Sequence, residues 1–200
     1  MDESGLISAA QQGDLDSFNR LVLAYQELIY NQAYRVMGET NAADDATQEA
    51  FIAAFRKLNT YRGGSFRAWL LRIVTNICYD ELRRRKRHPT TQLEPLDDAG
   101  EEIESPNWIA DPSETPEETA ERIELGQAIQ RCIDGLPPEF RVVVALVDIQ
   151  GLDYSEVSEV IGKPLGTVKS RLARARTRLR RCLQGFRELL PSAFRLEYEE

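Results

Sequence analysis

Apolar residues recur at three- and four-residue steps along the first part of the chain, which is the period of an amphipathic helix. The first such run follows Asp14, a favourable N-cap residue, and stops at Gly38. Asn41 and Ser65 are placed to cap two further helices. The pattern predicts a helical domain over residues 1–87. Its apolar positions are Phe18, Leu21, Val22, Tyr25, Leu28, Ile29 and Val36, then Ala50, Phe51, Ala54, Phe55 and Leu58, then Phe66, Leu70, Ile73, Val74, Ile77 and Leu82.

A second helical domain is expected over residues 117–190, with residues 191–200 as a tail. Thr115 and Glu118 form a capping-box pair at its start, which predicts a helix up to the Leu136–Pro138 break. Another helix is expected over residues 139–150. No segment has the alternating pattern of a strand, so the fold class is all-α, with two small helical domains.

The segment between the two domains, residues 88–116, has a different composition. It holds five of the nine prolines and most of an acidic stretch, Glu94–Glu124. That stretch contains twelve acidic residues and one basic residue. Such a segment buries too little apolar surface to offset its ordering entropy. We interpret it as an acidic, proline-containing linker, extended by proline stiffness and charge repulsion.

Charge is distributed unevenly along the chain. The formal net charge is −8, but the acidic stretch accounts for −11, so the remaining residues carry +3. Arg83–Arg87 contains five consecutive bases, and Lys163–Arg181 contains eight bases and no acid. Two local basic zones favour a polyanionic partner in spite of the acidic whole.

Composition narrows the class of protein further. With 42% hydrophobic and 29% charged residues, the chain is neither fibrous nor wholly disordered. No run approaches the roughly 18 apolar residues of a membrane span, and the acidic start Met1–Ser4 is unlike a secretory signal. We therefore expect a cytoplasmic protein without membrane insertion.

The residues that usually carry catalysis or hold metals are sparse. Cys78, Cys132 and Cys182 are about fifty residues apart, so we expect three reduced thiols and no disulfide framework. The one histidine, His88, has no ligand partners at metal-binding spacing. We expect no metal, no cofactor and no enzymatic activity, because no phosphate loop or paired catalytic acids are present either.

Residues 153–181 have the pattern of a helix-turn-helix. Asp153 and Glu156 open a short helix, Gly162 turns the chain, and a long helix starts near Leu165. In this motif the second helix enters the major groove, where Lys and Arg bind phosphates and guanine. The alternative is a solvated basic face on a structural helix. The outward residues are Thr167, Lys169, Ser170, Arg171, Arg174, Arg178 and Arg181.

The helix after Ser65 carries a polar stripe beside its apolar one. Its members, at four- and three-residue steps, are Arg72, Asn76, Tyr79, Arg83 and Lys86, with Trp69 at the border. Cations, aromatic rings and an amide on one surface suit single-stranded DNA, because bases stack and phosphates pair. The alternative is that Trp69 belongs to the core and that the basic end is only solvated.

Four segments together resemble one family. They are DDATQEAF at residues 44–51, YRGGSFRAWLLRIVTN at 61–76, LPPEF at 136–140 and LGTVKSRLARAR at 165–176. In this order they resemble the extracytoplasmic-function (ECF), sigma-E-like sigma factors of the bacterial sigma-70 family. That resemblance implies two helical domains, sigma-two and sigma-four, that direct RNA polymerase to promoters and promote strand opening, often in a stress response.

The resemblance also implies partners and site residues. The partners are promoter DNA, the β′ clamp coiled coil and β flap of core RNA polymerase, and an anti-sigma factor. Expected contacts with the polymerase are Asp44, Asp45, Gln48, Glu49, Phe51, Ile52 and Phe55. Expected minus-ten contacts are Gly63, Gly64, Ser65, Phe66, Arg72, Asn76, Tyr79, Arg83, Arg84 and Lys86. Expected minus-thirty-five contacts are Leu165, Gly166, Thr167, Lys169, Ser170, Arg171, Arg174 and Arg176.

Two other classes of function are possible alternatives for this sequence, a stand-alone regulator and an enzyme. A stand-alone helix-turn-helix regulator would need an apolar ligand pocket in its N-terminal domain. An enzyme would need a catalytic constellation that the sequence does not display.

Overall fold

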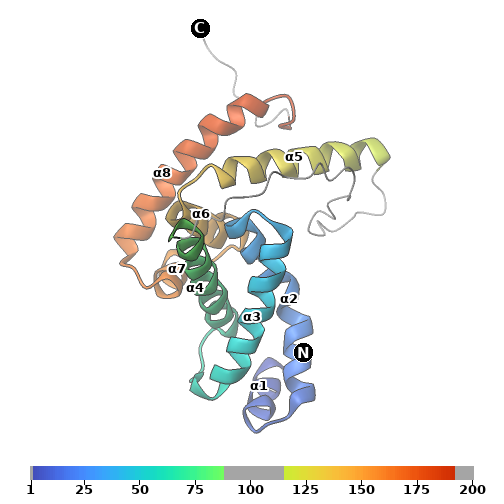
Figure 1. Ribbon diagram of the computed structural model, residues 1–200, viewed down its shortest axis with the longest axis vertical. Coiled ribbons are helices and arrows are strands. Elements are labelled where there is room, and N and C mark those ends of the chain that lie inside the picture. Colours follow the sequence, from blue (N-terminus) through green and yellow to red (C-terminus); the bar gives the residue numbers. More distant parts are fainter. Residues whose placement is uncertain (1, 88–114, 192–200) are drawn as a thin grey trace.

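The computed structural model describes residues 2–87 and 115–191, and the regular elements in these two ranges are all helical (Figure 1). This confirms the all-α class. None of these helices is both long enough and apolar enough to cross a membrane. The elements are α1 (Glu3–Gln11), α2 (Leu15–Met37), α3 (Thr40–Lys57), η1 (Leu58–Thr60), α4 (Phe66–Arg87), α5 (Pro116–Asp134), α6 (Pro138–Val144), η2 (Ala145–Ile149), α7 (Tyr154–Ile161), α8 (Leu165–Leu183) and η3 (Gln184–Phe186).

Helix ends in the N-terminal half, residues 2–87, follow the predicted signals with one exception. Asp14 caps α2, and Gly38 ends it in the left-handed conformation, with φ of 78°. Ser65 caps α4 by accepting a hydrogen bond from the Ala68 amide at 3.1 Å. The prediction for Asn41 was wrong, because α3 begins directly after the Gly38 turn and Glu39 takes the N-cap position.

The N-terminal helix α1 was not predicted from the apolar pattern. It packs against α2 and buries Leu6 and Ile7. Its Gln11 amide donates to the carbonyl oxygens of Leu58 and Tyr61, at 2.9 and 3.1 Å. This helix therefore fixes the start of the loop that leads into α4.

In the C-terminal half, residues 115–191, the two predicted capping boxes are present, at Thr115 and at Asp153. The helix predicted over residues 139–150 is not uniform. Its second part, η2, is a short π-helix. At its end the Gln150 amide donates to the Ala145 carbonyl, five residues earlier, at 2.9 Å. The interpretation of residues 88–114 as a linker concerns positions outside the described residues.

The cysteine prediction was wrong for two of the three thiols. Cys132 on α5 and Cys182 on α8 form a disulfide, with their Cα atoms 5.7 Å apart. Sequence spacing could not show this, because the two residues meet only when α5 packs across α8. Cys78 is a free thiol, buried on α4.

The two halves pack against each other around one continuous hydrophobic cluster. Helix α4 runs beside α7, while α2 packs against α5 and α6 (Figure 1). Ile29 and Leu71 from the N-terminal half and Val142 and Leu146 from the C-terminal half are fully buried members of this cluster. The described halves therefore form one body, although the sequence suggests two separate domains.

Candidate nucleic-acid interface

The loop before α4, residues 61–65, contains two glycines with positive φ and a tyrosine whose side chain bonds to the loop backbone. Gly63 and Gly64 have φ of 102° and 93°, a region that favours glycine. The Tyr61 hydroxyl donates to the Gly64 carbonyl at 2.7 Å. These contacts give the loop residues that were expected to bind a DNA base a defined, exposed position.

Aromatic rings gather behind this loop. Phe66 stacks on Trp69, with ring centroids 5.4 Å apart, and Tyr61 lies 5.5 Å from Trp69. Phe66 is only 1% exposed, so its ring supports Trp69 and Tyr61 from the core side and is not itself accessible from the surface. Trp69 is half-buried, which leaves part of its ring accessible for stacking.

The polar stripe of α4 continues from this cluster. Arg72, Asn76 and Arg83 are exposed, as helical spacing predicts. Tyr79 is half-buried, and burial raises the pKa of its hydroxyl to about 12, so the phenol stays protonated. Arg83 lies over the Tyr79 ring at 5.9 Å, which places a cation and an aromatic side by side.

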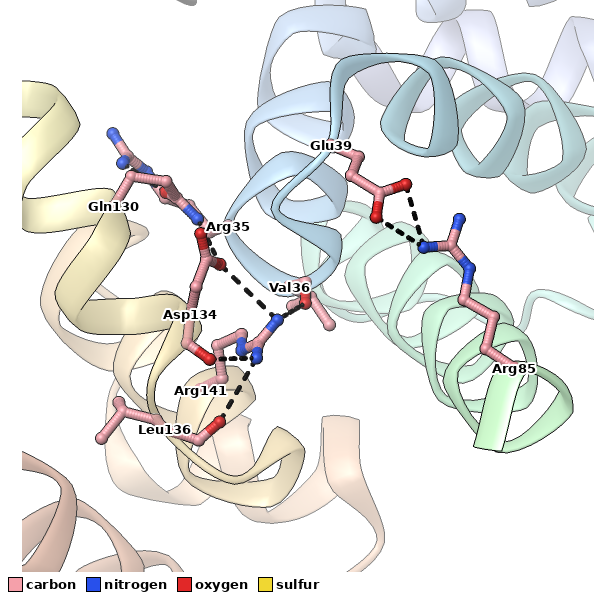
Figure 2. A network of polar contacts seen from close by, with 8 residues as sticks. All are labelled: Arg35, Val36, Glu39, Arg85, Gln130, Asp134, Leu136 and Arg141. Atoms are coloured by element: carbon pink, nitrogen blue, oxygen red, sulfur yellow. Dashed lines mark hydrogen bonds and ion pairs between the residues drawn. The ribbon is translucent and has the colours of Figure 1, made fainter. Parts of the chain in front are cut away.

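Not all bases at the end of α4 are free to meet a phosphate. Arg84 binds Glu81 at 2.7 Å, and hydrogen bonding from Arg84 lowers the pKa of that carboxyl. Arg85 binds Glu39 through two hydrogen bonds, of 2.9 and 3.0 Å (Figure 2). Arg85 therefore ties α4 to the start of α3, whereas Lys86 is exposed.

Helix α8 has the two-sided character expected of a recognition helix. Val168, Leu172 and Ala175 are buried, and the opposite side is exposed. The first turn is open, because a Cβ at Gly166 would meet no atom within 4 Å. Of the expected contacts, Leu165, Gly166, Lys169, Ser170, Arg174 and Arg176 are exposed, and Thr167 and Arg171 are half-buried.

Several bases of α8 have partners within the protein. Arg176 pairs with Asp148 of η2, and its Nε donates at 3.2 Å. Arg178 lies 5.3 Å over the Phe140 ring, and Lys169 lies 6.0 Å over Tyr154. Arg176 thus braces η2 against α8, a role that the sequence pattern did not indicate.

A third surface lies on α3. Its expected acidic and amide residues, Asp44, Asp45, Gln48 and Glu49, are exposed. Farther along the helix, Ile52 and Phe55 are 52% and 41% exposed and line a groove of about 390 Å³ with Phe51, Leu15 and Phe18. Leu15 is 58% exposed and was not predicted as part of this surface. Clustered exposed apolar side chains indicate a protein-binding site.

Comparison with known proteins places both halves in one family. Residues 21–88 match the family model for Sigma-70 region 2, and residues 126–179 match the model for Sigma-70, region 4. The chain is similar to the ECF RNA polymerase sigma factor SigE of Mycolicibacterium smegmatis, at 39% identity over 86% of this chain and 64% of that protein.

Two further comparisons cover nearly the whole of the matched proteins. The RNA polymerase sigma-H factor of Pseudomonas aeruginosa is 36% identical over 90% of this chain and 92% of its own length. The structure of CnrH in complex with the cytosolic domain of CnrY is 25% identical, with a TM-score of 0.62. That match covers 90% of this chain and 96% of CnrH.

Proposed function

We propose that this chain, which belongs to the ECF sigma factors of the sigma-70 family, directs RNA polymerase to specific promoters and helps to open them. The observation that carries the proposal is the order of the two matched regions, each with an exposed basic helix. Helix α4 carries Arg72 and Asn76 in the first region, and α8 carries Lys169 and Arg174 in the second. The partners that follow are core polymerase and promoter DNA.

The groove on α3 is proposed to bind core polymerase, through the β′ clamp coiled coil. Ile52, Phe55 and Leu15 would supply apolar area, and Asp44 and Glu49 would supply charge for the rim. This division matches protein interfaces in general, in which an apolar centre is surrounded by polar residues.

The minus-ten element is proposed to meet the loop at residues 63–65 and the stripe of α4. A base that leaves the duplex would stack on the accessible part of Trp69 and bond to the Asn76 amide, while Arg72 meets the backbone. Stacking is worth roughly 1–3 kcal/mol per base, comparable to the few kcal/mol needed to unstack it. Capture of a base therefore helps to melt the promoter without ATP.

The minus-thirty-five element is proposed to receive the first turns of α8. The open helix start at Gly166 suits a phosphate, and Lys169 and Arg174 face outward toward a groove. We further propose that the protein acts in the cytoplasm, that it serves a stress response and that an anti-sigma factor regulates it. The resemblance of the fold to CnrH, whose structure holds the cytosolic domain of CnrY, supports regulation by a second protein.

Run-off transcription with purified core polymerase on a promoter library tests this proposal. Lys169→Ala should lower transcription from a selected promoter about tenfold, because a lost base contact is worth roughly 1–3 kcal/mol. Arg187→Ala is the matched control, since Arg187 is exposed but lies beyond the region 4 match. The proposal fails if the chain supports initiation at no template, and the recognition-helix assignment fails if both variants transcribe like the wild type.

A further inference from the structure

Helix α1 packs against η1, the turn that leads into the loop proposed to meet the minus-ten element (Figure 1). This loop, residues 61–65, is called the base-capture loop below. Helix α1 lies before the segment that matches Sigma-70 region 2, residues 21–88, so the match assigns no role to it. Its polar side chains nevertheless bond to the start of the base-capture loop and to the aromatic cluster behind it.

Gln11, the last residue of α1, bonds to both ends of the η1 turn. Its side-chain amide donates to the Leu58 carbonyl at 2.9 Å and to the Tyr61 carbonyl at 3.1 Å. The Leu58 carbonyl also accepts from the Tyr61 backbone amide, at 3.0 Å. A side-chain amide has two N–H donors, so Gln11 uses its full donor capacity on this turn. Gln11 thus fixes the backbone of the residue from which the base-capture loop starts.

The middle of the base-capture loop has few other supports. A Cβ at Gly63 or Gly64 would meet no atom within 4 Å, so this side of both residues is open. The loop ends at Ser65, whose carbonyl accepts from the Trp69 amide at 3.0 Å in the first turn of α4. A short segment that is fixed at its ends and open between them takes its position from those ends. The bonds of Gln11 to the start of the loop therefore help to set where its glycines lie.

The other end of α1 is linked to the aromatic cluster behind the loop. The Tyr25 hydroxyl of α2 donates to the Glu3 carboxylate of α1. Burial and this carboxylate raise the pKa of the Tyr25 hydroxyl to about 12, so it stays protonated and remains a donor. The Tyr25 ring meets Phe66 edge-on, with centroids 5.6 Å apart, and Phe66 stacks on Trp69. Helix α1 is thus connected to the ring on which a promoter base is proposed to stack.

We propose that Gln11 is a positioning residue for promoter opening, which holds Tyr61 and the base-capture loop in the geometry that receives a base leaving the duplex. This inference rests on the proposed function. Gln11 acts through Tyr61, whose ring lies 5.5 Å from Trp69 and whose hydroxyl bonds to the Gly64 carbonyl. A binding site needs its groups held to within about 0.5 Å, so a loosened loop receives the base less well.

A purely structural role for Gln11 predicts a different result. If its two bonds only stabilised the N-terminal half, their loss would lower the unfolding temperature and every activity together. A positioning role instead separates two steps of initiation. Binding of the closed promoter uses duplex contacts elsewhere, whereas strand opening uses the base-capture loop. The comparison of these two steps therefore distinguishes the roles.

Gln11→Ala tests the proposal, because it removes both bonds to the η1 turn. In holoenzyme with purified core polymerase, on a promoter selected by run-off transcription, it should open the minus-ten element about fivefold more slowly. This is the loss expected for hydrogen bonds of ordinary strength. The fluorescence of 2-aminopurine in the minus-ten element measures opening. Anisotropy of labelled promoter at low temperature measures closed-complex affinity, which should be unchanged.

Gln12→Ala is the matched control, since Gln12 is the next residue and is exposed. Gln11→Lys retains a donor and should open the promoter faster than Gln11→Ala. Gln11→Glu has only acceptors, which would face two carbonyl oxygens, so it should open the promoter more slowly than Gln11→Ala. Gln12→Lys and Gln12→Glu correct for the added charge.

Tyr25→Phe is a second variant, to be used if circular dichroism shows that Gln11→Ala does not fold. It keeps the ring beside Phe66, loses the bond to Glu3 and should slow opening about twofold. Equal opening rates for folded Gln11→Ala and Gln12→Ala would overturn the positioning role. A parallel loss of closed-complex affinity and opening rate would overturn it too, in favour of a structural role. If wild-type holoenzyme opens no promoter, the proposed function itself fails.

Discussion

At the scale of single residues, internal partners distinguish basic side chains that look alike in the sequence. Arg84 and Arg85 are bound to carboxylates, and Arg176 is bound to Asp148. Arg174 is exposed on α8 as well, but it makes no ion pair among the described residues. An exposed ion pair contributes little to stability, but it does compete with a DNA phosphate for the same cation. Arg174 is therefore better placed than Arg176 to bind the promoter.

The cysteines allow a prediction at this scale. Cys78 is fully buried, and burial raises the pKa of its thiol to about 12, so almost no thiolate exists at pH 8. The folded, oxidised chain should therefore bind no thiol reagent, and the unfolded, oxidised chain should bind one equivalent at Cys78. If the chain is reduced and then unfolded, all three cysteines should bind the reagent.

Mass spectrometry after alkylation checks these labelling counts. A Cys78→Ser variant serves as the control, since it should remain unlabelled when unfolded without reductant. Labelling of three thiols in the unfolded, unreduced wild type would contradict the disulfide between Cys132 and Cys182.

At the scale of elements, α3 shows how one helix serves both core and partner. Small residues, Ala43, Ala46, Ala50 and Ala54, are buried and let α3 approach α2 and α4 closely. The opposite side then presents Ile52 and Phe55 without contributing them to the core. The exposed side chains are thus available to a partner without being needed for the stability of the fold.

Ile52→Glu should weaken binding to core polymerase more than tenfold, because it places a charge in the apolar centre of the proposed interface. Fluorescence anisotropy of the labelled chain with core polymerase measures the effect. Leu23→Glu is the control, since Leu23 of α2 is 68% exposed and lies outside the groove. Equal affinities for the two variants would place the polymerase contact elsewhere.

At the scale of the whole molecule, the shared hydrophobic cluster couples the two halves. Leu172 of α8 and Leu21 of α2 belong to the same cluster, although they lie in different family regions. Continuous packing of this kind favours a single cooperative unfolding transition. The packing between the two halves would then be visible in the stability of the chain.

Leu172→Ala should lower the free energy of unfolding by about 2–5 kcal/mol, because it leaves a cavity in a buried site. The loss should appear at Trp69, in the other half, if the halves unfold together. Urea unfolding followed by fluorescence checks this in a Trp108→Phe background, which leaves Trp69 as the only tryptophan. An unchanged Trp69 transition would show that the halves unfold independently.

The elements and the chemistry of their surfaces follow from local patterns. The helical period, the capping boxes at Thr115 and Asp153, and the basic face of α8 depend on residues within a few turns of one another. The resemblance to the ECF sigma factors rested on contiguous motifs as well, and the comparisons confirmed the family. The predicted N-cap at Asn41 was wrong, because several neighbouring residues can take the N-cap position of the same helix and Glu39 takes it in the structure.

Tertiary structure decided which of these residues meet. The contacts of Arg35 with Gln130 and of Arg141 with Val36 join residues 95 and 105 positions apart, and the disulfide joins two cysteines 50 apart. No periodic pattern specifies such pairs, because they depend on how whole helices pack. The packing of the two halves, the paired state of the cysteines and the internal partners of the arginines are therefore properties of the folded molecule. Its helices and its family, by contrast, can be predicted from the sequence.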